Sequence, residues 1–111
     1  MENSNPTAQE PHNGNNTIAG LEGVLKPENK ARVTIRLNEG NDHPNLAFWL
    51  EDANGAHIAR SFIINCSELQ VDFTLHLRSV NPPLPITLHC ETFFEDDQPI
   101  DHKECTIEAS S

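Results

Sequence analysis

The stretch Gln70-Val71-Asp72-Phe73-Thr74-Leu75-His76-Leu77-Arg78 alternates polar and apolar side chains along its whole length. In an extended chain, successive side chains point to opposite faces. One face of this segment therefore holds Val71, Phe73, Leu75 and Leu77. The pattern predicts a β-strand with one face buried in a core and the other face in water.

Neighbouring segments repeat the same pattern. In Ala31–Leu37, the apolar positions are Val33, Ile35 and Leu37. Two further runs, Asn45–Ala53 and His57–Asn65, flank Asn54-Gly55, the pair best able to take the two positive φ values of a type I′ turn. We therefore expect a β-hairpin here. In its first arm Trp49 points away from the apolar face, so this strand is apolar on both sides.

Three more segments complete the predicted sheets: Leu21–Leu25, Ile86–Phe94 and His102–Ala109. About seven short strands, with clusters of Asn, Asp, Gly and Pro between them and no crossover helices, predict an all-β fold, an antiparallel β-sandwich. This domain spans residues 17–111. Residues 1–16 are rich in Asn and lack large aliphatic side chains, which predicts a disordered polar tether.

The charge of the chain limits its partners. Seventeen acidic against seven basic residues give a formal net charge of −10. Such a chain repels nucleic acid and anionic membrane surfaces, so we expect neither as a direct partner. Solubility alone also accounts for a charge of this size.

Three cysteines, Cys66, Cys90 and Cys105, stand without the CxxC or CxxH spacing typical of zinc sites. One disulfide and one free thiol fit this count best, and three buried reduced cysteines are the alternative. Cys90 and Cys105 fall on the inward faces of neighbouring predicted strands. A bridge between these two is therefore the predicted disulfide.

No motif for catalysis or cofactor binding is found in the sequence. No serine or cysteine lies in a Gly-x-Ser-x-Gly elbow, and the glycines are too scattered to form a phosphate-binding loop. Asp101, His102 and Glu104 form a polar cluster near Asp96 and Asp97, but a solvated acidic turn explains it better than a metal cage. We expect no enzyme, no cofactor and no metal site.

Surface for partner binding remains. Trp49 and Phe93 fall on the faces opposite the best apolar stripes of their strands. An exposed aromatic pair on a sheet would anchor a partner. The alternative is that the two sheets bury both rings at a sandwich end or under a loop.

Between Gly23 and Ile100, four features occur in a recognisable order: Gly23, Leu50-Glu51-Asp52, Ile58-Ala59 and Gln70-Val71-Asp72-Phe73-Thr74-Leu75. This order of elements resembles the small outer-membrane lipoproteins that include the type III secretion pilotins, the YscW- and YbaY-like lipoprotein chaperones. The resemblance implies a periplasmic β-sandwich that is tethered to the outer membrane through a lipidated Cys just before Glu2, which this chain does not contain.

These observations give two competing functions. The first is a non-enzymatic pilot or chaperone that holds a segment of a secretin or other envelope protein, by strand addition or in an apolar groove. The second is an immunoglobulin-like or carbohydrate-binding adhesion module that uses Trp49, Phe93 and nearby Asn and Asp side chains.

Overall fold

The computed structural model describes residues 17–39, 43–94 and 99–109, and within them the protein is all β. The strands are β1 (Ile18–Lys26), β2 (Lys30–Leu37), β3 (Asn45–Glu51), β4 (His57–Ile63), β5 (Gln70–His76), β6 (Thr87–Phe93), β7 (Asp101–Thr106) and the two-residue β8 (Glu108–Ala109). Each of the seven predicted strands is present. No helix among these residues is long and apolar enough to cross a membrane.

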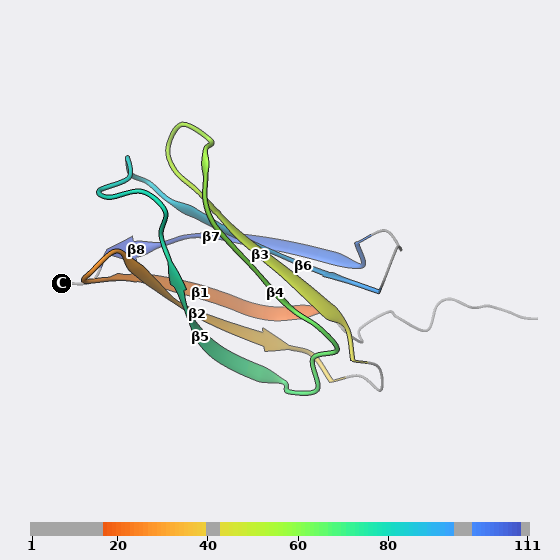
Figure 1. Ribbon diagram of the computed structural model, residues 1–111. Coiled ribbons are helices and arrows are strands. Elements are labelled where there is room, and N and C mark those ends of the chain that lie inside the picture. Colours follow the sequence, from red (N-terminus) through yellow and green to blue (C-terminus); the bar gives the residue numbers. More distant parts are fainter. Residues whose placement is uncertain (1–16, 40–42, 95–98, 110–111) are drawn as a thin grey trace, which may run out of the picture.

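The strands form two four-stranded sheets packed face to face, in the orders β5-β2-β1-β8 and β4-β3-β6-β7 (Figure 1). All pairings are antiparallel except the short one between β1 and β8. The predicted β-sandwich is confirmed. Its connection order follows the immunoglobulin constant domain, in which strands one, two and five share one sheet and strands three, six and seven the other. Here β4 joins the sheet of β3.

The core lies between the sheets and is built from the alternate positions that the sequence predicts. Val33 and Ile35 on β2 are fully buried, and Phe48 on β3 is 1% exposed. The Phe48 and Phe73 rings meet edge to face across the two sheets, with their centroids 4.8 Å apart. Burial of these alternating side chains provides the main driving force for the fold.

The β3–β4 hairpin is confirmed, but its turn is not the predicted type I′. Only Gly55 of the Asn-Gly pair has a positive φ, 85°. The Gly55 amide donates to Asp52 O (3.0 Å), and Asp52 Oδ1 accepts from the amides of Asn54 (2.8 Å) and Ala56 (3.0 Å). The Asp52 carboxylate thus stabilises a longer loop that needs one left-handed residue, which glycine supplies.

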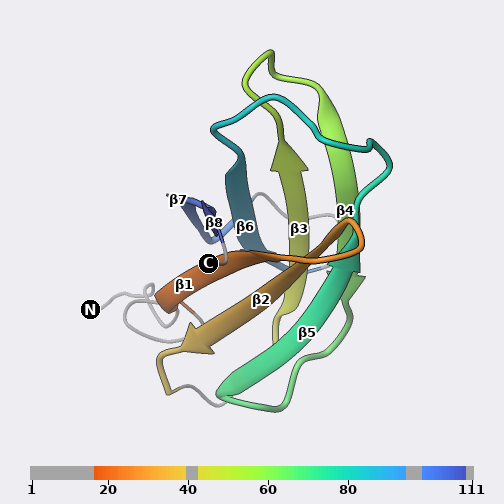
Figure 2. The same ribbon diagram turned by 90° about the vertical axis from the view of Figure 1, so that its left-hand side faces the viewer.

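The last predicted strand is divided between the sheets. β7 pairs with β6, and after Ile107 the chain crosses so that β8 pairs with β1 (Figure 2). Ile107 is 5% exposed and packs beside Gly23, where an added Cβ would lie 2.8 Å from Ile107 Cδ1. Because Gly23 has no side chain, the crossing segment can pack against β1 and close this end of the core.

The predicted disulfide between Cys90 and Cys105 is not formed. All three cysteines are free thiols. In the register of β6 and β7, Cys90 lies opposite Lys103, and Cys105 lies opposite Leu88. The two residues share a face but are diagonal neighbours across the strand pair. Such neighbours are typically about 7–8 Å apart, beyond the Cα separation of about 4.4–6.8 Å that is usual for a disulfide.

Candidate functional site

The outer face of the β4-β3-β6-β7 sheet brings together rings and carboxylates from all four strands. The register of β3, β6 and β7 places Trp49, His89 and Glu104 in one row across the sheet. Glu51 lies two residues along β3, opposite His57 of β4. We call these five residues, together with His102 of β7, the ring cluster.

Trp49 is the centre of the ring cluster. Its ring is almost parallel to that of His89, with 4.9 Å between centroids and 5° between planes. The His102 ring lies 5.9 Å away at 17°, and the His57 ring 6.3 Å away at 29°. Because β4 and β6 flank β3, imidazoles approach the indole from both neighbouring strands.

Hydrogen bonds connect the imidazoles into one network. His89 Nε2 lies 2.9 Å from Glu51 Oε1, and His57 Nε2 lies 3.2 Å from Glu51 Oε2. On the other side of its ring, His89 Nδ1 lies 3.1 Å from His102 Nε2 and 3.6 Å from Glu104 Oε1. A carboxylate only accepts, so His89 donates from Nε2 to Glu51 and, when neutral, accepts at Nδ1 from His102.

The two predicted binding residues lie apart on this face. Trp49 is in the ring cluster, whereas Phe93 lies opposite Asn45. Phe93 is four residues beyond His89 on β6, or about 13 Å along the strand. Both side chains are half-buried, so the sheet neither exposes them fully nor covers them. The predicted pair is therefore two separate features of one surface.

The predicted polar cluster is partly assembled. His102 and Glu104 lie together on the outer face, but Asp101 Oδ2 accepts the Ile18 amide (2.8 Å) and ties β7 to β1. Asp96 and Asp97 lie outside the described residues. His89 and Glu51 were missed by the sequence analysis, because neither stands at a recognisable spacing from His102. The alternation within Asn45–Ala53 and Ile86–Phe94 does place them on the outer face.

Beside the ring cluster lies β4, the edge strand of this sheet, and no other strand in the described part of the chain pairs with its outer side. The Arg78 amide donates to Ile58 O (2.8 Å) and covers the start of this edge. Farther along, Phe62 is 57% exposed and Ile64 is 67% exposed. An edge strand flanked by exposed apolar side chains can pair with another extended segment.

A groove of about 400 Å³ lies elsewhere, between the β1–β2 turn and the segment after β5. Its apolar lining includes Leu25, Pro27, Leu77 and Leu84. Leu84 is 60% exposed at its rim. The ring cluster contributes no residue to this groove, so the two surfaces are independent.

Comparisons with known proteins report on the fold. No family model and no curated protein matches the chain. Among solved structures, it is similar to β-glucuronidases from Lactobacillus rhamnosus, Ruminococcus gnavus and Dictyoglomus thermophilum, with TM-scores of 0.55, 0.54 and 0.53 and sequence identities of 17%, 12% and 17%, in that order. Each match covers 84% of this chain, and it covers 15%, 16% and 15% of the three enzymes.

The chain thus spans about a sixth of the length of these enzymes. At such identities, the similarity shows a shared β-sandwich fold. The resemblance to the pilotin lipoproteins stays a prediction, because these matches do not bear on it.

Proposed function

We propose that this chain is a non-catalytic β-sandwich recognition module that captures an extended protein segment beside β4. The observation that carries the proposal is the outer edge of β4, which pairs with no further strand among the described residues. Phe62 on β4 and Ile64 just after it are 57% and 67% exposed. In strand addition, main-chain hydrogen bonds along an edge give affinity, and alternate side chains give specificity. Trp49 of the ring cluster lies on the same sheet, one strand further in from this edge, opposite Arg60 of β4.

Within this class, we propose a pilot or chaperone for an envelope protein, such as a secretin. Two features support it: the order of elements in the sequence, which resembles that of the pilotin lipoproteins, and the edge of β4. A lipidated tether to the outer membrane is part of this proposal. The codons upstream of Glu2 test it, because a lipobox ending in Cys is expected there, and any other leader would remove the tether from the proposal.

The experiment is capture from an envelope extract by the purified chain. Phe62→Lys and Ile64→Lys place charges on the β4 edge, which native sheets use to block pairing. Leu69→Lys is the matched control, because Leu69 is 48% exposed just before β5, on the other sheet. We expect the retained protein to be lost with the first two variants and kept with the third.

Two results would end this proposal. One is that no envelope protein is enriched over an unrelated β-sandwich. The other is that the same protein is retained equally by all three variants. Leu84→Lys tests the groove that Leu84 lines after β5. Loss of capture with that variant alone would indicate that the partner docks in this groove and not at the β4 edge.

A carbohydrate-binding module is the second candidate, favoured by a tryptophan flanked by carboxylates and imidazoles on an exposed sheet. The arrangement of the rings weighs against it, because His57 and His89 approach the indole from both neighbouring strands and occupy the space a sugar ring needs for stacking. A glycan array checks this candidate. Hits that change Trp49 fluorescence would replace protein capture as the proposed function.

A further inference from the structure

Three potential metal ligands converge at one end of the ring cluster. They are His89 Nδ1 on β6, and His102 Nε2 and Glu104 Oε1 on β7, and all three atoms lie within 4.8 Å of one another. His89 Nδ1 is 3.1 Å from His102 Nε2 and 3.6 Å from Glu104 Oε1. A tetrahedral ion with bonds of about 2.0–2.2 Å sets its ligand atoms about 3.3–3.6 Å apart. Two of the three separations already approach this spacing.

The two imidazoles meet at their nitrogens and not face to face. Their nitrogens are 3.1 Å apart, whereas their ring centroids are 5.3 Å apart. The lone pair of His89 Nδ1 is therefore directed towards His102, where it accepts a hydrogen bond in the neutral tautomer. A metal ion would replace this hydrogen bond, and the proton on His102 Nε2 would move to its Nδ1, so that both facing nitrogens offer a lone pair. His102 is exposed on the edge strand β7, so its ring can shift to admit the ion.

Glu51 supplies the second requirement of a built metal site. A ligating histidine normally donates its other ring nitrogen to a carboxylate, which fixes its tautomer and orientation. His89 Nε2 contacts Glu51 Oε1 at 2.9 Å, and the other oxygen of Glu51 contacts His57 Nε2 at 3.2 Å. The side chain of His89 is only 12% exposed, so its ring is held in this position.

We propose that His89, His102 and Glu104 form a binding site for a divalent transition metal of the zinc type, with Glu51 as the positioning residue. Two imidazoles and one carboxylate suit Zn²⁺, whereas Mg²⁺ and Ca²⁺ prefer oxygen ligands alone. Three protein ligands leave a coordination position for water or for a group of a bound partner. The net charge of −10 also attracts cations to the protein.

Calorimetric titration of the tag-free chain with Zn²⁺ tests the site. We expect one equivalent to bind. His102→Ala and Glu104→Gln should each weaken it about tenfold or more, and Glu51→Gln about 10–100-fold. The matched control is His76→Ala, because His76 is an exposed histidine on β5 of the other sheet. That variant should bind as the parent chain does.

A second readout separates binding at this site from loss of structure. Trp49 is the single tryptophan, and its ring lies parallel to both imidazole ligands. Its fluorescence should change as Zn²⁺ binds, and Glu104→Gln, which keeps the shape of the side chain, should reduce this response.

The inference is overturned if no Zn²⁺ binds at about millimolar concentration. It is also overturned if His102→Ala, Glu104→Gln and His76→Ala all bind as the parent chain does. Either result leaves capture at the β4 edge intact, because that proposal is tested with a protein partner and with variants of Phe62 and Ile64.

Discussion

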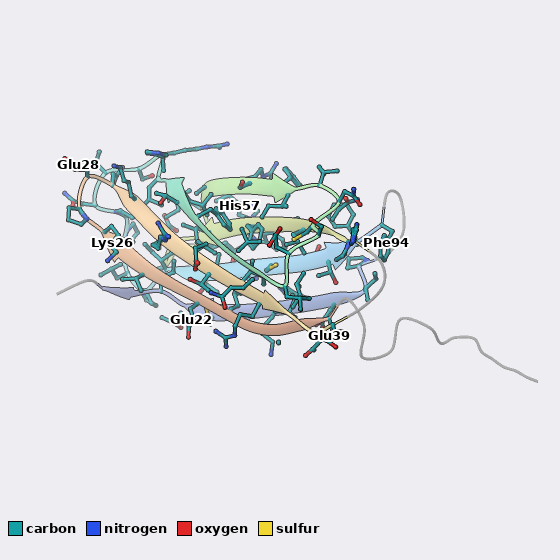
Figure 3. The ribbon with its side chains drawn as sticks, turned by 90° about the horizontal axis from the view of Figure 1, so that it is seen from below. Glu22, Lys26, Glu28, Glu39, His57 and Phe94 are labelled. Carbon is teal, nitrogen blue, oxygen red and sulfur yellow. The ribbon has the colours of Figure 1, made fainter. Side chains whose placement is uncertain are left out.

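The two outer faces of the sandwich share a backbone geometry but differ in how their side chains interact. On the β5-β2-β1-β8 sheet the contacts are exposed pairs. Glu22 of β1, which is labelled in Figure 3, pairs with Arg36 at 4.0 Å, and the side chains of Arg36 and Glu22 are 45% and 67% exposed. Exposed ion pairs contribute little to the free energy of unfolding, with a median of about 0–1 kcal/mol per pair. On the other sheet, Trp49, His89 and Glu51 are partly buried against one another and share contacts.

This difference between the two faces supports the proposed role of one of them in recognition. A solvated face needs only polar side chains at alternate positions, and the first face has those. A face that places rings, imidazoles and carboxylates in register across four strands has an arrangement that solubility does not require. We therefore propose the outer face of β4-β3-β6-β7 for recognition, and the opposite face as a solvated surface.

The largest effect is expected from breaking the core that supports both faces. Phe48→Ala removes a ring that is 1% exposed and contacts Phe73 of the other sheet. We expect a loss of about 3–5 kcal/mol in unfolding free energy, measured by denaturant titration. Phe48→Leu should lose less, about 1–1.5 kcal/mol. Equal losses for the two variants would contradict the packing described.

Thiol labelling compares two cysteines on β6 and β7, the strands that carry part of the ring cluster. Burial, and secondarily Asp101, raises the pKa of the Cys90 thiol, and burial raises the pKa of Cys105, which is partly exposed on β7. At neutral pH, Cys105 should react about a hundredfold faster than Cys90, whose exposure requires larger opening of the fold.

In denaturant without reductant, three thiols should be labelled. Labelling of a single thiol under those conditions would mean that the other two cysteines form a disulfide, and would contradict the free thiols of the structure.

Matched truncations compare the two faces directly. Trp49→Ala removes the ring that contacts three imidazoles, and we expect a loss of about 1–2 kcal/mol. On the outer face of the other sheet, Thr34→Ala on β2 removes a hydrogen bond to Asp72 on β5. We expect the unfolding free energy to change by no more than about 0.5 kcal/mol. Denaturant titration of both variants checks the difference. A larger loss of unfolding free energy for Thr34→Ala than for Trp49→Ala would mean that the outer face of β5-β2-β1-β8 holds the stronger side-chain contacts, contrary to our account.

A small effect of the opposite sign, a gain in stability, is expected at Thr92 on the inner side of β6. Its side chain is fully buried, and within the described residues its hydroxyl has no hydrogen-bond partner. Thr92→Val keeps the shape and removes the hydroxyl, which should raise the unfolding free energy by up to about 1 kcal/mol. Thermal unfolding measures this small gain. A clear loss would mean that the hydroxyl has a partner in solution.

The sequence was sufficient to predict the strands and the inward face of each, because burial with a period of two is a local signal. Val33, Ile35, Phe48 and Leu75 all lie inside as predicted. The β3–β4 turn was predicted less well, because the Asp52 side chain competes for the backbone amides there.

The ring cluster could not be predicted as a unit. Trp49 and His89 become neighbours because β3 pairs with β6, a strand distant in sequence, and Glu104 joins them through a register that no local pattern fixes. For the same reason Cys90 and Cys105 were expected to bridge, although a two-residue offset makes them diagonal. Side chains on separate strands meet only once the register is known.

The most direct test of our central claim is hydrogen–deuterium exchange of the chain, with and without the envelope protein that it retains. The account predicts that protection increases along β4 and β3, around Phe62 and Trp49, and that β1, β2 and β5 keep the exchange of the free chain. Protection centred on β2 and β5, with β4 unchanged, would contradict it.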